Sequence, residues 1–175
     1  SVGKTAFALN LARNAAVEFN EPVAFFSLEM TSMELLDRLI ATESGISSDK
    51  LKGKLKLLPE EWQVLEQSVG RIVKAPIYID ETPGITLTEF VAKSKRLVRE
   101  KGVKIIFVDY LQLMHSGKPQ LGGFSKVQEV TEISNTLKTT AKELNIPIIA
   151  LAQLNRNLMS RMGSNGKPVL SDLKD

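Results

Sequence analysis

The chain has 175 residues, of which 43% are hydrophobic and 25% are charged, a composition typical of one ordinary folded domain and not of a disordered chain. Its net charge of +3 permits a polyanionic partner without requiring one. The absence of cysteine excludes a disulfide framework, and no apolar run approaches the roughly 18 residues of a membrane span, so we expect a soluble cytoplasmic protein with no membrane partner.

The first predicted elements alternate between helix and strand. The segment 5–17, rich in alanine and leucine, is a strong helix former. The run "VAFFSL" at 23–28 is continuously apolar and of strand length, the pattern of a strand buried on both faces. Thr31 and Glu34 fit the S/T-x-x-E capping box of a further helix, which should stop at Gly45.

The middle of the chain repeats this alternation. Residues 59–73 begin with a proline and two acids, as the first turn of a helix often does. The run "PIYID" at 76–80 predicts a strand. Thr86 and Glu89 form a second capping box, which opens a helix that should stop at Gly102.

The last third predicts two more strands and one long helix. The strands are "KIIFVD" at 104–109 and "IPIIALAQ" at 146–153. Between them, the polar stretch 115–124 precedes a helix over 125–144, opened by a serine and a glutamine three residues apart. The final stretch 155–175 is polar, basic and glycine-containing, and is expected to be a loop.

This alternation predicts the α/β class, with a mostly parallel sheet, helices on both faces and right-handed crossovers. Ligands of such sheets bind beyond the carboxyl ends of the strands. The polar residues that follow the predicted strands are Glu29, Asp80, Asp109 and Gln153.

A Gly-Lys-Thr sequence stands at the start of the first helix. These are the last three positions of the phosphate loop G-x-x-x-x-G-K-[ST]. In such a loop Lys4 would place an ammonium against the β- and γ-phosphates, Thr5 would give its hydroxyl to Mg²⁺, and Gly3 would let backbone N–H groups approach. Taken alone, the three residues fit equally well a helix that happens to begin this way.

Two acids compete for the place of a metal carboxylate. Asp109 closes the apolar run "IIFVD", as the Asp of a Walker B strand does. Asp80 closes "IYID", but the following residues "ETPG" predict a turn, which makes Asp80 and Glu81 turn residues. The alternative for Asp109 is a solvated loop acid.

Glu29 and Gln153 are weaker candidates. Glu29 follows the strand after the Gly-Lys-Thr helix, where it could take a proton from a water in line with a γ-phosphate. The alternative is an acid favoured by the dipole of the next helix. An amide at Gln153 could bond the γ-phosphate and report its loss, although a glutamine at a strand end decides nothing in isolation.

Four segments in order, "GKTAFALNLA", "VAFFSLEM", "IIFVDYLQLM" and "IIALAQLNR", resemble the motor domain of bacterial replicative DNA helicases of the DnaB type, which has a RecA-like core. The resemblance covers nearly the whole chain. It implies a RecA-like P-loop NTPase that uses ATP and Mg²⁺. It further implies that Lys4 and Thr5 hold phosphates and metal, that Glu29 is the catalytic base, that Asp109 lies by the metal, and that Gln153 senses the γ-phosphate.

The resemblance also implies that residues 1–175 are a single but partial RecA-like ATPase domain. The chain begins inside the phosphate loop, so the first strand of the fold is lacking, and so are the C-terminal strands and the arginine finger. The first strand is central in such sheets, so its neighbours would be left unpaired. We expect these 175 residues alone to fold poorly and to be inactive.

Members of this family thread single-stranded DNA through a homo-hexameric ring. The resemblance therefore implies single-stranded DNA as a partner, with primase and a helicase loader as further partners. Two basic stretches suit contact with DNA phosphates. Their candidate residues are Lys118, Lys126, Arg156, Arg161 and Lys167. The alternative for both stretches is an ordinary solvated loop.

The function predicted is therefore an ATP-dependent replicative DNA helicase motor, which couples ATP hydrolysis to movement on single-stranded DNA and to duplex unwinding. One alternative is another RecA-like ATPase of DNA recombination or repair. The other is a non-catalytic interaction module with a RecA fold. Two isolated residues are given structural interpretations: Trp62 as part of a helix core and His115 as a loop residue.

Overall fold

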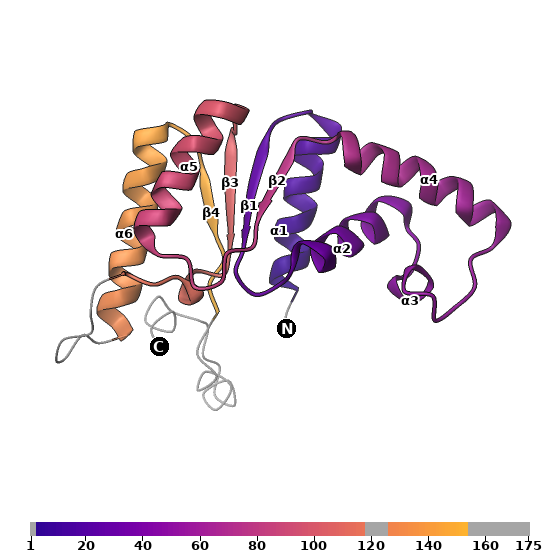
Figure 1. The fold of residues 1–175 in the computed structure, drawn as a ribbon, viewed down its shortest axis with the longest axis horizontal. Helices are drawn as coiled ribbons and strands as arrows, with labels where there is room; N and C mark the ends of the chain where they lie inside the picture. Colours follow the sequence, from indigo (N-terminus) through magenta and orange to yellow (C-terminus); the bar gives the residue numbers. More distant parts are fainter. Residues whose placement is uncertain (1–2, 118–125, 154–175) are drawn as a thin grey trace, which may run out of the picture.

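The computed structural model describes residues 3–117 and 126–153. Its centre is a four-stranded sheet in the order β2-β1-β3-β4, and every pair of neighbours is parallel. Figure 1 shows the strands side by side with helices before and behind them. The prediction of a parallel α/β sheet is confirmed. The strands are β1 (Val23–Ser27), β2 (Ile77–Asp80), β3 (Ile105–Asp109) and β4 (Ile148–Ala150).

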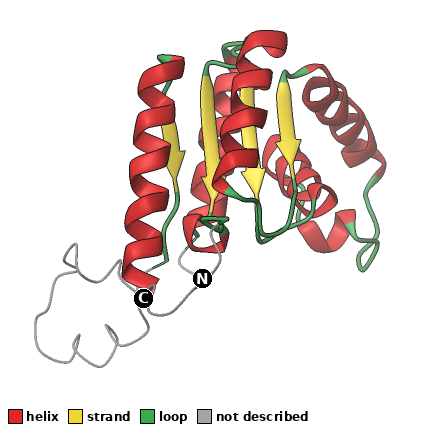
Figure 2. Cartoon of the chain, turned by 60° about the vertical axis from the view of Figure 1, so that its left-hand side comes forward, coloured by secondary structure: helices red, strands yellow, loops and turns green. Residues whose placement is uncertain are grey.

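Helices cover both faces of this sheet, as the two views in Figures 1 and 2 show. The helices α1, α2 and α4 pack on one face, and α5 and α6 pack on the other. The α-helices are α1 (Lys4–Arg13), α2 (Ser32–Ser44), α3 (Ser48–Leu51), α4 (Pro59–Lys74), α5 (Leu87–Lys101) and α6 (Lys126–Leu144).

The side chains of β1 divide the core into two clusters because successive residues of a strand point to opposite faces. Phe26 packs against Phe90 of α5, with ring centroids 4.8 Å apart. Phe25 stacks on Phe107 of β3, with centroids 5.8 Å apart, under α1 and α2. All five residues of β1 are buried, which explains why its sequence is apolar without alternation.

The local signals for helix boundaries are confirmed at two helices. Thr31 and Glu34 form a complete capping box at α2, and Thr86 and Glu89 form one at α5. In each box the hydrogen bond from the threonine backbone N–H is the main cause that lowers the pKa of the glutamate. Both helices end at a glycine in the left-handed conformation, where a side chain would be strained.

A buried carboxylate joins the three helices on one face of the sheet. The Glu43 side chain on α2 is only 2% exposed and is held by Arg13 of α1 and Arg71 of α4, each at 2.5 Å. Glu18 binds the same two arginines at 2.7 and 3.2 Å. The far end of α1 is thereby fixed to α2 and α4.

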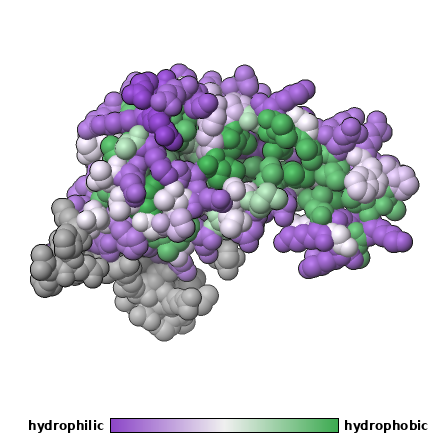
Figure 3. Space-filling view, in the orientation of Figure 1, coloured by the Kyte–Doolittle hydropathy of each residue, from purple (hydrophilic) through white to green (hydrophobic). Residues whose placement is uncertain are grey.

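Some expectations about single elements need correction. The helix predicted over 5–17 is α-helical only to Arg13 and continues as a π-helix over Asn14–Glu18. The placement of Trp62 in a core is wrong, because this residue is 60% exposed on α4. Val64 and Val73 on the same helix are also exposed. Figure 3 shows an apolar area over the region of β2 and α4.

The described strands form one continuous sheet, in which β2 and β4 each pair with a neighbour on one side only. Within the described ranges, no helix is long and apolar enough to cross a membrane.

Candidate functional site

The start of α1 lies against the carboxyl end of β3. Gly3 caps the helix with a φ of 80°, a left-handed conformation that favours glycine, and its carbonyl accepts the N–H of Phe7. The Thr5 hydroxyl donates to Asp109 Oδ2 at 2.6 Å. Both residues are buried, and Asp109 is only 1% exposed. The structure thus brings together two residues that are 104 positions apart and that the sequence motifs had each indicated as a candidate for the magnesium site.

The other oxygen of this carboxylate suits a cation. Asp109 Oδ1 is buried and has no hydrogen-bond partner among the described residues. A buried acceptor without a partner is costly, and a hard cation such as Mg²⁺ prefers oxygen ligands such as a carboxylate and a hydroxyl. Thr5 and Asp109 therefore fit a magnesium ion. The part of the chain that the structure describes holds no cluster of three or more His, Cys, Asp or Glu side chains that could bind a metal by itself.

Lys4 places its ammonium between the ends of β3 and β4. Its Nζ donates to the Ala152 carbonyl oxygen at 3.2 Å and lies 5.0 Å from the ring centroid of Tyr110. The contact with the ring face is of the cation–π kind. A phosphate bound at the start of α1 would compete with this carbonyl for the same ammonium.

Glu29 lies in the loop between β1 and α2, and its side chain is exposed. The loop itself is well anchored. Leu28 N–H donates to the Asp109 carbonyl at 2.8 Å, and the Ser27 hydroxyl donates to the Met30 carbonyl at 2.6 Å. A pocket of about 790 Å³ lies beside this loop and is lined by residues 27–31 and 79–83. The backbone that carries Glu29 is thereby held next to Asp109, while the carboxylate stays accessible.

The other candidate acid, Asp80, binds groups in and near the turn that follows β2. Its Oδ1 accepts the Thr82 N–H at 3.1 Å, and its Oδ2 is bound by Lys93 at 2.6 Å. Burial raises the pKa of Asp80, but the hydrogen bonds from Lys93 and Thr82 outweigh it and hold that pKa below its ordinary value. The neighbouring Glu81 accepts the N–H of Ser32 at the start of α2. The interpretation of Asp80 and Glu81 as turn residues agrees with these contacts.

This arrangement predicts a pH-dependent effect of Asp80→Asn. Because the folded-state pKa is lowered, the carboxylate stabilises the fold above about pH 4, and this stability is lost as the pH falls through the folded-state pKa. We expect Asp80→Asn to lower the free energy of unfolding at about pH 7 and to have a smaller effect at about pH 3. Chemical denaturation followed by circular dichroism measures both values.

Asp49→Asn is the matched control, since Asp49 and Lys54 form an ion pair with side chains 59% and 69% exposed. Its effect should be small at either pH. An equal loss for Asp80→Asn at both pH values would contradict the structural assignment.

Gln153 follows β4, and its backbone is held by a residue that sequence reasoning missed. Gln112 Nε2 donates to the Gln153 carbonyl at 2.8 Å, and Gln153 N–H donates to Gln112 Oε1 at 3.2 Å. Gln153 itself is exposed. The only signal for Gln112 in the sequence is its place three residues after Asp109.

The candidate DNA-contacting residues stay predictions. Lys118 and the three residues Arg156, Arg161 and Lys167 lie outside the described residues, and Lys126 opens α6 with a side chain that the structure does not describe.

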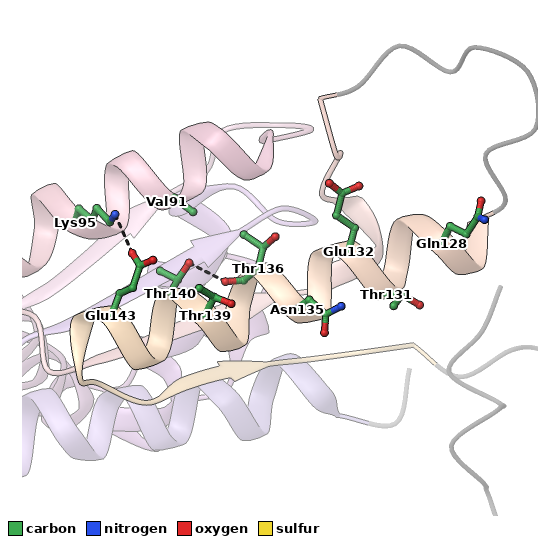
Figure 4. Close-up of a pocket in the computed structure, with 10 residues that line it drawn as sticks. All are labelled: Val91, Lys95, Gln128, Thr131, Glu132, Asn135, Thr136, Thr139, Thr140 and Glu143. Carbon is green, nitrogen blue, oxygen red and sulfur yellow. Dashed lines mark hydrogen bonds and ion pairs between the residues drawn. The ribbon is translucent and has the colours of Figure 1, made fainter.

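A second pocket, of about 550 Å³, lies between α5 and α6 and holds none of the predicted site residues. Figure 4 shows threonines along α6 on its wall, with Lys95 and Glu143 paired at 2.9 Å at one end. The Thr140 hydroxyl is used within the helix, where it donates to the Thr136 carbonyl at 2.8 Å. The site defined by Lys4, Thr5 and Asp109 is separate from this groove.

Comparison with solved structures gives the fold class of this chain. The chain is similar to a DnaB-like replicative helicase that was described with its interactions with primase, with a TM-score of 0.87 and 34% identity, covering 99% of this chain and 41% of that one. It is also similar to a second solved structure, an ATPase domain, with a TM-score of 0.86 and 35% identity over 99% of this chain and 60% of that one. The chain therefore has a RecA-like α/β fold.

The family model of the DnaB-like helicase C-terminal domain matches residues 1–175, and the chain belongs to this family. Its relatives include the replicative DNA helicase DnaB of Geobacillus stearothermophilus, which is 44% identical over the whole of this chain. The replicative DNA helicase DnaC of Bacillus subtilis (strain 168) is 43% identical, also over the whole chain. The chain spans 37% of the length of each of these two relatives.

Proposed function

We propose that this chain is the ATP-hydrolysing motor domain of a replicative DNA helicase, which couples hydrolysis to movement on single-stranded DNA and to duplex unwinding. The observation that carries the proposal is the buried Thr5–Asp109 pair at the start of α1, with Lys4 beside it. A helix N-terminus with a purely structural role would not require a buried carboxylate beside it with one oxygen that has no hydrogen-bond partner among the described residues. Membership of the DnaB-like family supports the same function.

The positions of the side chains support the following roles. Thr5 and Asp109 would hold Mg²⁺, and the bound ion would supply positive charge beside the phosphates. Lys4 binds the β- and γ-phosphates, and the N–H groups at the start of α1 add further donors near Gly3. Glu29 takes the proton of the attacking water.

Gln153 completes the site by bonding the γ-phosphate. Ala152, whose carbonyl accepts from Lys4, directly precedes it in the chain. This adjacency supports a role at the same phosphate. A glutamine amide offers both donors and an acceptor, so it can bond the γ-phosphate without adding charge.

The test of this function uses the full-length protein, as the unmodified parent and as Lys4→Ala, and measures ATP turnover with and without single-stranded DNA and the affinity for nucleotide. The parent should hydrolyse ATP faster with DNA, and Lys4→Ala should bind nucleotide more weakly. A parent that binds ATP without hydrolysing it would instead favour a non-catalytic module. A parent that hydrolyses ATP but fails to unwind a forked duplex would favour a recombination or repair ATPase.

The full-length protein is proposed to act as a homo-hexamer, in which the neighbouring subunit supplies an arginine to the γ-phosphate. Primase and a helicase loader are proposed as its protein partners. The DnaB-like structural relative described with primase supports the first of these two.

DNA binding by the basic segment after Gln153 gives a separate prediction. We expect Arg156→Ala with Arg161→Ala, in the full-length protein, to flatten the salt dependence of binding to an oligo(dT) strand. The slope of log K against log salt should fall by about 0.7 for each DNA phosphate that the variant no longer neutralises. Fluorescence anisotropy at several salt concentrations measures this slope, and an unchanged slope would make the two arginines solvated loop residues.

A further inference from the structure

The Gln112 side chain binds the backbone of a residue that is distant in the sequence. Both ends of its amide bind the backbone of one residue: Nε2 donates to the Gln153 carbonyl at 2.8 Å, and Oε1 accepts the Gln153 N–H at 3.2 Å. Two antiparallel hydrogen bonds fix the orientation of a residue as well as its position, as they do between paired strands. The backbone of Gln153 is therefore held although β4 has already ended at Ala150.

The segment that carries Gln112 is itself firmly placed. It leaves Asp109 as a short 3₁₀ turn over Leu111–Leu113, and Leu111 N–H donates to the Leu151 carbonyl at 2.9 Å. Beyond the turn, Met114 is buried, with 1% of its surface exposed. His115 exchanges backbone hydrogen bonds with Ile85 and Leu87 at the start of α5. Gln112 thus projects from a segment that is anchored on both sides.

The three residues at the end of β4 each contact a different part of the candidate site. Leu151 is bound to the segment after Asp109, the Ala152 carbonyl accepts from Lys4, and Gln153 is bound by Gln112. The side chain of Gln153 takes no part in the bridge, which uses only backbone atoms of that residue. The side chain stays available for a phosphate, and the backbone from which it extends is fixed relative to Asp109 and Lys4.

From these contacts we infer that Gln112 is a positioning residue that holds Gln153 at the distance and angle at which its amide meets the γ-phosphate. The inference rests on the proposed function, because it takes Gln153 as a residue that bonds this phosphate. Misplacement of a group by about 1 Å can cost about 100-fold in rate, so a positioning residue affects the chemical step more than binding. In the proposed function ATP is bound mainly by Lys4 and the start of α1, whereas the side-chain hydrogen bonds of Gln112 go to Gln153.

The test is a double-mutant cycle in the full-length protein with Gln112→Ala and Gln153→Ala, measured as kcat and KM for ATP. We expect Gln112→Ala to lower kcat by about 10-fold and to change KM by less than about 3-fold. In the Gln153→Ala background the same change should cost almost nothing more, since the residue that it positions is already gone. Gln67→Ala, at an exposed glutamine on α4, is the matched control and should leave both constants unchanged.

A conservative variant separates hydrogen bonding from packing. Gln112→Glu keeps the length and shape of the side chain but has no N–H to give to the Gln153 carbonyl. It should therefore lower kcat as Gln112→Ala does, with an unfolding temperature close to that of the parent. A parent-like kcat for Gln112→Glu would overturn the inference, because the donated hydrogen bond would then be dispensable.

Further outcomes would also overturn it. Effects of Gln112→Ala and Gln153→Ala that multiply in the double variant would show that the two residues act independently. A rise in KM with kcat unchanged would show that Gln112 serves binding alone. A parent-like kcat for the single variant Gln153→Ala would identify the failure as one of the proposed role of Gln153, and the inference would fall with it.

Discussion

Glu29→Gln in the full-length protein is expected to keep ATP binding and to lower turnover by about 10² to 10⁴, the usual effect of losing a positioned base. The reason is that the amide cannot accept a proton from water, while the loop that carries it stays anchored by Leu28 and Ser27. Single-turnover hydrolysis measures the rate, and a fluorescent ATP analogue measures the affinity.

Glu21→Gln is the control for this variant. Glu21 is also exposed and lies at the opposite end of β1 from Glu29. Its turnover should equal that of the parent. Hydrolysis at the parent rate by Glu29→Gln would show that another residue is the base, and Glu29 would then be an acid placed near the start of α2 for its dipole.

The second large effect is expected for Asp109→Asn. On the proposed role of Asp109, removing its negative charge should weaken binding of Mg²⁺, an ion that can stabilise a transition state by several kcal/mol. Turnover should therefore fall by about 10² to 10⁴ at saturating Mg²⁺. The asparagine oxygen can still accept the Thr5 hydroxyl, so the fold should be retained.

Two measurements separate the metal from the fold in this variant. The dependence of turnover on Mg²⁺ concentration should shift to higher concentrations for Asp109→Asn, whereas the unfolding temperature should stay close to that of the parent. Asp49→Asn, at an exposed ion pair on α3, is the control. Unchanged Mg²⁺ dependence with a lowered unfolding temperature would make Asp109 a structural acid.

Local signals were enough to predict most of the fold. The run "VAFFSL" is apolar without alternation because β1 is covered on both faces, so it indicated a parallel sheet directly. Capping boxes involve residues only three positions apart, so Thr31 and Thr86 marked the starts of their helices correctly.

Features that depend on distant contacts were not accessible in this way. Trp62 lies on an amphipathic helix, and periodicity alone does not show whether its face meets another element. The choice of Asp109 over Asp80 rested on a turn motif. The structure adds a physical reason, because both carboxylate oxygens of Asp80 already accept hydrogen bonds, one from Thr82 and one from Lys93.

The candidate site shows the same limit. The phosphate-loop motif and the strand ends indicated Lys4, Thr5, Glu29, Asp109 and Gln153, the resemblance implied their roles, and the structure places Thr5 in contact with Asp109. Gln112 was not predicted, because its side chain binds the backbone of a residue 41 positions away. Every residue has the same backbone carbonyl, so residue types do not indicate such a contact. Side chains that serve a distant main chain are generally invisible to motif reasoning.

The arginine pair around Glu43 has a consequence for experiments at varied ionic strength. Ions screen exposed charges over a Debye length of about 8 to 10 Å near physiological salt, but they reach a carboxylate that is 2% exposed far less well. Although the Arg71 side chain is 50% exposed, added salt should therefore leave α1, α2 and α4 joined at Glu43. A loss of binding to single-stranded DNA at high salt would then report competition of salt ions for the DNA phosphates, and not a loosening of the domain.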